Sequence, residues 1–166
     1  GMSKQYTRIY KEAEGFGACV HTMRYGLFEG NVTGSKDGQP VAPLMGNIKD
    51  YDGGAGDYQM GPLTFMLNYP DHCVLYRFLP RSLTETDVEL VWIVRGDAEE
   101  GKDYNREDVV WLWDHTTQED EYIILRNNAG VNSRFFEPGP YHPEFEATLQ
   151  KFVGWYLHNL EKVSHA

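Results

Sequence analysis

Histidines, cysteines and one acidic residue are the side chains of this sequence that could hold a metal or act on a substrate. No two of the six histidines stand three or four residues apart, so no helix presents a metal-binding pair on one face: His21, His72, His115, His142, His158 and His165. Cys19 and Cys73 stand among apolar neighbours without a C-x-x-C partner, which is typical of buried thiols in a reducing compartment. Asp120 precedes an apolar run, and this pattern alone predicts a solvent-facing acid.

The elements that must position these side chains begin with strands. Alternating apolar residues predict that residues 62–95 form three strands, joined by turns too short for parallel crossovers, and hence an antiparallel meander. Ahead of the meander, Asp37-Gly38 predicts a turn with a left-handed glycine. The segment from Asp52 to Asp57 is the strongest loop signal in the chain.

The last third of the chain is predicted to be helical. Asn105 is a good N-cap, Thr116-Thr117 predicts an interruption, and a second stretch from Gln118 to Asn128 is predicted to end at Gly130. After Pro143, apolar residues at helical spacing predict a C-terminal amphipathic helix of about five turns: Phe145, Leu149, Phe152, Tyr156 and Leu160. A meander followed by helices indicates an α+β fold with the long C-terminal helix packed across the sheet.

Length and charge narrow the classes of function. The 166 residues fit a single domain over residues 2–166, and the formal net charge of −10 disfavours nucleic acid and an anionic membrane surface as partners. No apolar run approaches the ~20 residues needed to span a bilayer, and no basic-then-apolar leader opens the chain. We therefore expect a cytoplasmic protein.

One stretch carries a family resemblance. From Asp120, through Gly130 and Ser133, to Pro138-Gly139-Pro140, the sequence resembles the C-terminal signature of the Rieske non-haem iron oxygenases, the large subunits of aromatic ring-hydroxylating dioxygenases. Two places depart from the signature, since Leu125 and Asn128 stand where the family has Glu and Gln. Further segments are similar to the family, so that the resemblance covers about residues 40–160: Ala42 to Gly46, Val91 to Val94, Gly96 to Tyr104, Leu112-Trp113-Asp114, and Phe152 with Trp155 and Tyr156.

The resemblance implies a helix-grip (START/SRPBCC-like) fold and a ferrous iron held by two histidines and one carboxylate. Asp120 matches the carboxylate, and in this alignment it is expected to face the cavity rather than solvent. The segment from Ser3 to Arg8 resembles the end of the family's histidine motif and places Ser3 where the second histidine stands. His21 and His115 are possible substitute ligands outside the motif. No C-x-H or C-x-x-H pattern occurs, so we expect the chain itself to hold no iron–sulfur cluster.

Three functions follow as expectations. The chain is a catalytic-domain portion that oxygenates an aromatic or other apolar small molecule, completed by a Rieske-domain or reductase partner chain; alternatively, it is a non-catalytic ligand-binding protein with a vestigial iron site, or it has an assembly role. The resemblance also implies a homo-oligomer, a trimer. Apolar strand residues are candidates to line a ligand cavity: Phe65, Leu67, Leu75, Tyr76 and Trp92.

Overall fold

The computed structural model describes residues 6–9, 21–143 and 145–164. Six strands form one antiparallel sheet in which spatial order follows chain order: β1 (Tyr6–Ile9), β2 (His21–Gly26), β3 (Gly54–Gln59), β4 (Thr64–Asn68), β5 (Cys73–Pro80) and β6 (Thr86–Ile93). The meander predicted over residues 62–95 is confirmed as β4, β5 and β6. The loop predicted from Asp52 to Asp57 is wrong beyond Gly53, because residues from Gly54 onward pair with β2 and β4. Gly38 has a φ of +77°, which confirms the predicted left-handed turn.

Two helices follow the sheet: α1 (Arg106–Val131) and α2 (Ala147–Ser164). The predicted N-cap is confirmed, since the Asn105 side chain accepts a hydrogen bond of 2.9 Å from the Glu107 backbone N–H. The predicted break at Thr116-Thr117 is wrong: the Thr117 hydroxyl donates to the Trp113 carbonyl over 2.6 Å, so this threonine is satisfied inside the helix. The predicted end at Gly130 is also displaced, because α1 continues to Val131.

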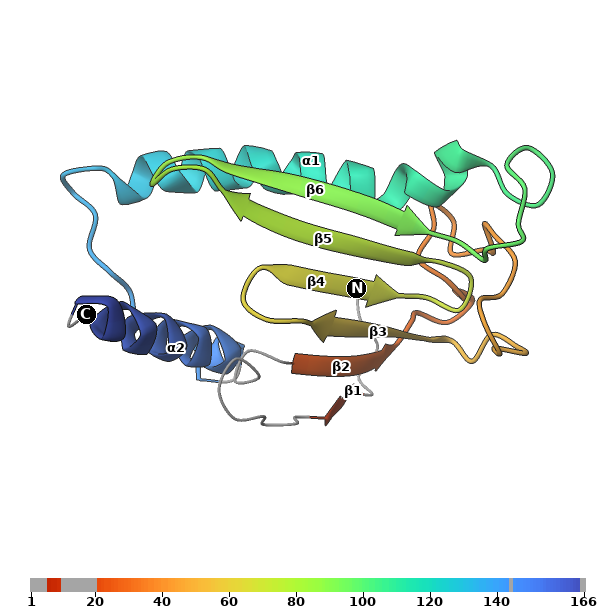
Figure 1. Ribbon diagram of the computed structural model, residues 1–166, viewed down its shortest axis with the longest axis horizontal. Helices are drawn as coiled ribbons and strands as arrows, with labels where there is room; N and C mark the ends of the chain where they lie inside the picture. Colours follow the sequence, from red (N-terminus) through yellow and green to blue (C-terminus); the bar gives the residue numbers. More distant parts are fainter. Residues whose placement is uncertain (1–5, 10–20, 144, 165–166) are drawn as a thin grey trace.

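The helix that packs along the sheet is α1, not the C-terminal helix. Figure 1 shows α1 running alongside β5 and β6, whereas α2 lies beyond the ends of the middle strands. Of the four side chains predicted to pack across the sheet, Phe152 is half-buried, whereas Phe145 is 75% exposed and Leu149 and Tyr156 are exposed as well. The prediction is therefore wrong for Phe145, Leu149 and Tyr156. Amphipathic spacing identified the helix, but it does not specify which surface covers the apolar stripe.

We call the face of the sheet that α1 covers the inner face. Tyr25, Ala55 and Tyr69 form its buried cluster, and Trp113 of α1 packs against them together with Leu67. Strand alternation and the pairing register place Tyr76 on the inner face, and its ring lies edge-on to Trp113 with 6.1 Å between ring centroids. Trp113 therefore packs α1 against side chains of β2, β3 and β5.

A long connection over residues 27–53 joins β2 to β3 and is fixed by one buried carboxylate. Asp71, in the turn between β4 and β5, accepts hydrogen bonds from the Thr33 hydroxyl and, over 3.0 Å, from the Val41 backbone N–H. The His72 Nδ1 atom lies 2.9 Å from the same carboxylate, and the side chains of Asp71 and His72 are 0% exposed. Burial alone would raise the pKa of Asp71, but the bonds from His72, Thr33 and Val41 outweigh it and hold the pKa below its ordinary value.

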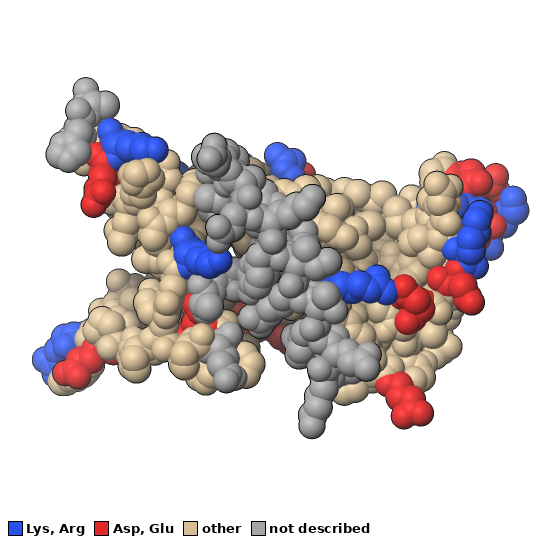
Figure 2. All heavy atoms as spheres, turned by 90° about the horizontal axis from the view of Figure 1, so that it is seen from below, with Lys and Arg blue, Asp and Glu red and all other residues tan. Residues whose placement is uncertain are grey.

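Charges on the surface are mixed. On the face drawn in Figure 2, Lys and Arg side chains alternate with Asp and Glu and do not gather into a basic patch. Among the described residues, no helix combines the length and apolar character that crossing a membrane requires.

Candidate functional site

Asp120 lies in the middle of α1, on the side of the helix that faces the sheet. Trp113, Thr117 and Asp120 follow one another at four and three residues, so they share one helix face. The Tyr76 hydroxyl fixes this face against β5, since it lies 2.7 Å from the Thr117 Oγ1 atom. Asp120 is nevertheless exposed. This exposure contradicts the expectation that Asp120 faces a cavity rather than solvent.

The negative charge of Asp120 still affects a residue of the inner face, Tyr76. Burial raises the pKa of the Tyr76 hydroxyl, the negative charges of Asp120 and Asp114 raise it further, and the contact with Thr117 opposes them. Tyr76 thus lies within electrostatic reach of two carboxylates of α1. The inner face beside this part of the helix is therefore aromatic and negatively charged.

The structure does not bring the candidate histidines to Asp120. His115 is exposed, and its ring stacks on Trp111 with 5.0 Å between centroids. It precedes Asp120 by five residues, which places the two about 140° apart around the helix axis. His21 pairs with Gln59 through its backbone, while its side chain and Ser3 lie outside what is described. Within the described part of the chain, no three His, Cys, Asp or Glu side chains gather as a metal site needs.

Four of the five cavity candidates share the inner face. Phe65 pairs with Tyr76, Leu67 with Val74, and Trp92 with Val74 from the other side, so Phe65, Leu67, Tyr76 and Trp92 all point toward α1. Leu75 points to the opposite face, where its neighbour Cys73 donates through Sγ to the Asn68 side chain over 2.9 Å. All five are half-buried.

A buried acid–phenol pair on the inner face was not among the predicted site residues. The Tyr25 hydroxyl donates to Asp57 Oδ1 over 3.1 Å. Burial raises the pKa of Asp57 from 3.8 to about 6, although the bond from Tyr25 opposes the shift. Burial, the Tyr69 hydroxyl and the Asp57 charge raise the pKa of Tyr25. In the sequence, Asp57 could have been recognised as an acid inside a strand, but the glycines around it favoured the prediction of a loop.

The raised pKa makes Asp57 a source of pH-dependent stability. Because folded Asp57 binds its proton more tightly than the unfolded chain does, it contributes stability at low pH that is lost as the pH rises from about 4 to about 6. We expect Asp57→Asn, which cannot ionise, to raise the melting temperature at pH 7.5 relative to the parent and to have a smaller effect at pH 4. Asp52→Asn, at an exposed carboxylate, is the control and should change little at either pH. An equal effect of Asp57→Asn at both pH values would contradict the assignment.

Comparison with known proteins places the chain in a family. Residues 5–162 match the family "Ring hydroxylating alpha subunit (catalytic domain)". The chain is 35% identical over 142 residues to the glycine betaine monooxygenase oxygenase subunit of Chromohalobacter salexigens, a match that covers 85% of this chain and 32% of that protein. It is 34% identical over 154 residues to the subunit of the same name from Pseudomonas aeruginosa, covering 90% of this chain and 36% of the relative.

The chain thus spans about a third of the length of these relatives. The matched region includes the whole sheet, α1 with Asp120, and nearly all of α2. The resemblance predicted from the residues around Asp120, Gly130 and Ser133 is confirmed: the chain belongs to the family of ring-hydroxylating oxygenase alpha-subunit catalytic domains.

Proposed function

We propose that this chain forms the C-terminal part of the catalytic domain of an iron-dependent oxygenase large subunit and supplies the iron-binding carboxylate, Asp120. The observation that carries the proposal is the family match over residues 5–162, which runs continuously through α1 and the spaced Asp120, Gly130 and Ser133. In this assignment the two histidines and the Rieske cluster come from a partner chain or from another part of a longer polypeptide.

The residues described here do not by themselves fit an iron centre. A facial triad needs two histidines beside the carboxylate, and no such group exists among the described side chains. Asp120 supplies one ligand, and its exposure leaves it accessible to a completing segment. No reaction step is assigned to this chain alone.

The relatives favour a substrate class other than the predicted aromatic one. Both are named as glycine betaine monooxygenase oxygenase subunits, and their named substrate carries a methylated ammonium group. The inner face would suit such a cation, because aromatic rings and carboxylates attract alkylammonium groups. We therefore propose oxygenation of a small methylated ammonium compound. A trimeric assembly and a reductase partner stay part of the proposal.

A second candidate function is a ligand-binding protein with a vestigial iron site. The observation that favours it is the exposed Asp120 without two histidine neighbours among the described residues. Iron content separates the two functions. The chain alone should bind well under one ferrous iron in an anaerobic titration, because two of three ligands are missing.

The experiment that tests the proposal supplies the missing ligands from a relative. We expect one iron per subunit in a chimera in which this chain replaces the matching third of the Chromohalobacter salexigens relative. Asp120→Ala should abolish that iron, whereas Glu119→Ala, at a neighbouring exposed acid, should retain it. A chimera that folds without iron would favour the vestigial site. Tight stoichiometric iron in the isolated chain, lost in Asp120→Ala, would instead point to substitute ligands, with His21 and His115 tested first.

A further inference from the structure

β6 lies at an edge of the sheet, and its outer side has no partner strand. Within the described parts of the chain it pairs with β5 alone, and Figure 1 shows it as the outermost strand on that side. Every second residue of such a strand points its N–H and C=O groups away from the sheet. Folded proteins ordinarily protect an edge with charges, proline or a covering segment. Asp87 and Glu89 protect the first half of β6, whereas residues 90–93 are all apolar.

A groove of about 470 Å³ follows the apolar half of β6. Leu90, Val91 and Trp92 line one side of it, and Val109 and Val110 of α1 line the other. Because consecutive residues of a strand point to opposite faces of the sheet, a groove that meets three of them in a row lies against the strand edge. Free backbone groups beside a groove are the setting in which proteins accept an added strand. The occupant that these features fit is an extended backbone.

β6 is complementary to a second copy of itself in the antiparallel orientation. In a register centred on Val91, this side chain lies opposite the partner's Val91, and Ile93 lies opposite the partner's Glu89. At both ends of the contact, Asp87 lies opposite the partner's Arg95. Opposite charges therefore meet at the ends of this face, and its centre is apolar and available, since Val91 is 37% exposed and Ile93 is 40% exposed.

The other face of the paired strands is apolar throughout in the same register. Leu90 lies opposite the partner's Trp92, and Val88 lies opposite the partner's Val94. Val88 is 44% exposed, so part of its surface is free to be covered. Both faces thus carry the cross-strand pairs that stabilise an antiparallel sheet.

Neighbouring registers are less favourable. A centre at Glu89 places two glutamates directly opposite each other, and like charges in that position are destabilising. A centre at Trp92 places Asp87 opposite the partner's Asp97, which is a second acidic pair. A centre at Leu90 leaves Asp87 opposite an apolar side chain. The register centred on Val91 is therefore the one in which charge and apolar pattern agree.

The charges select the register and add little to the affinity. Asp87 already pairs with Arg81, and Arg95 with Asp97, and these side chains are exposed. Exposed ion pairs contribute little to association because water and salt screen them. The affinity comes from the backbone hydrogen bonds of the two edges and from the apolar pairs around Val91.

We propose that two copies of this chain associate through β6 in the register centred on Val91, so that one sheet continues into the other across a two-fold axis. Two-fold contacts are the commonest in soluble homo-oligomers. The contact is independent of the proposed iron site. It is compatible with the proposed trimer, because two trimeric rings joined by two-fold axes form a closed hexamer.

The oligomeric state of the whole chain tests the association. In sedimentation velocity over a concentration series, we expect a dimer that dissociates on dilution, or a hexamer if the trimer forms as well. Val91→Lys places two lysines opposite each other and should raise the dissociation constant of the two-fold contact about tenfold or more. Ile123→Lys, at a more exposed apolar residue of α1, is the matched control and should leave that constant unchanged. Circular dichroism checks that each variant folds.

Cross-linking tests the register. Val91→Cys places two thiols opposite each other, where the Cα atoms of paired strands lie about 4.5–5.5 Å apart, within the range that a disulfide bridges. Oxidised glutathione should therefore link this variant into covalent dimers, with the parent chain as the control for its own thiols. Ile93→Cys should stay unlinked, because its two copies lie about 13 Å apart along the strands. A mixture of Ile93→Cys and Glu89→Cys should link.

A chain that stays monomeric at high micromolar concentration would overturn the proposal. Equal weakening by Val91→Lys and Ile123→Lys, or no weakening by Val91→Lys, would do so as well. Cross-linking of Ile93→Cys as fast as Val91→Cys would place the contact in another register or on another surface. Neither experiment needs iron, so their failure would leave the Asp120 proposal intact, just as an iron-free chimera would leave this contact intact.

Discussion

Replacing Asp71 by alanine is expected to lower the free energy of unfolding by ~3–5 kcal/mol, the cost typical of breaking a buried charged pair. The carboxylate is 0% exposed and satisfies three donors: the Thr33 hydroxyl, the Val41 backbone N–H and the His72 ring. Alanine would leave all three buried without an acceptor and would release residues 27–53 from the turn between β4 and β5. Urea denaturation measures the change.

The dependence of stability on pH provides an independent check on the role of Asp71. Since its pKa is held below the ordinary value in the folded state, its contribution is present above the unfolded pKa of about 3.9 and is lost as the pH falls through the folded value. The Asp71→Ala variant should therefore lose less stability on acidification than the parent does. Asp52→Ala removes a carboxylate that is 59% exposed and paired with Arg24, and we expect a change within ~1 kcal/mol. Similar losses in both variants would mean that the buried network contributes little.

Trp113→Ala is expected to cost ~3–5 kcal/mol, as for other large aromatic side chains that join elements of a core. Its ring packs on the cluster of Tyr25, Ala55 and Tyr69 and lies edge-on to Tyr76, so its removal opens the layer between α1 and the sheet. Chemical denaturation monitored by circular dichroism gives the value for the whole chain.

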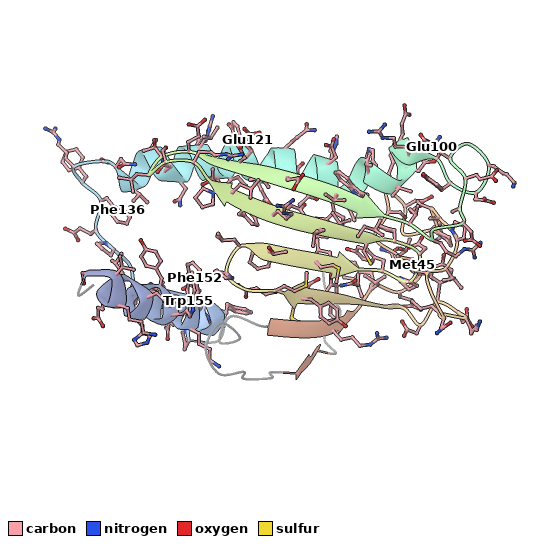
Figure 3. All side chains as sticks on the ribbon, in the orientation of Figure 1. Met45, Glu100, Glu121, Phe136, Phe152 and Trp155 are labelled. Atoms are coloured by element: carbon pink, nitrogen blue, oxygen red, sulfur yellow. The ribbon has the colours of Figure 1, made fainter. Side chains whose placement is uncertain are left out.

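Phe152→Ala is the matched comparison, because the same experiment tests which helix covers the sheet. Phe152 lies on α2 near Trp155, with 6.1 Å between ring centroids, and is half-buried (Figure 3). We expect a smaller loss than for Trp113→Ala. A larger loss would mean that α2 and not α1 supplies the main cover of the sheet, as the sequence pattern predicted.

The strands after Gly61 were predictable because their chemistry is local. Alternation from Leu63 onward and the turn at Pro70-Asp71 specify β4 and β5 without reference to distant residues. The N-cap at Asn105 is local in the same way, since a side chain satisfies an N–H two residues on. These elements were placed within a few residues.

The features that were missed depend on contacts between distant parts of the chain. Thr117 breaks no helix because its hydroxyl meets both the Trp113 carbonyl and Tyr76, which lies 41 residues earlier. Glycines around Asp57 form a strand because β2 and β4 pair with it on both sides. No local pattern contains this information.

The candidate site likewise combines a residue that spacing in the sequence predicted with contacts that it did not predict. Asp120 was found through a spaced motif, and the family match extends over it. The surroundings of Asp120 were not predicted correctly, because its exposure depends on which element covers α1. The pairing of Tyr25 with Asp57, and of Asp71 with Thr33, joins residues 32 and 38 positions apart, a distance at which spacing in one sequence carries no signal.

The strand order has a consequence for synthesis on the ribosome. Each strand pairs with the strand before or after it in the chain, so the sheet can grow by one hairpin at a time as the chain emerges. All six strands are translated before Trp113, which means that the inner face is complete while the helix that covers it is still unmade. Without α1, Leu67, Tyr76 and Trp92 lack the helix that covers their face of the sheet. Released chains truncated between residues 94 and 112 should therefore bind chaperones more strongly than the whole chain does.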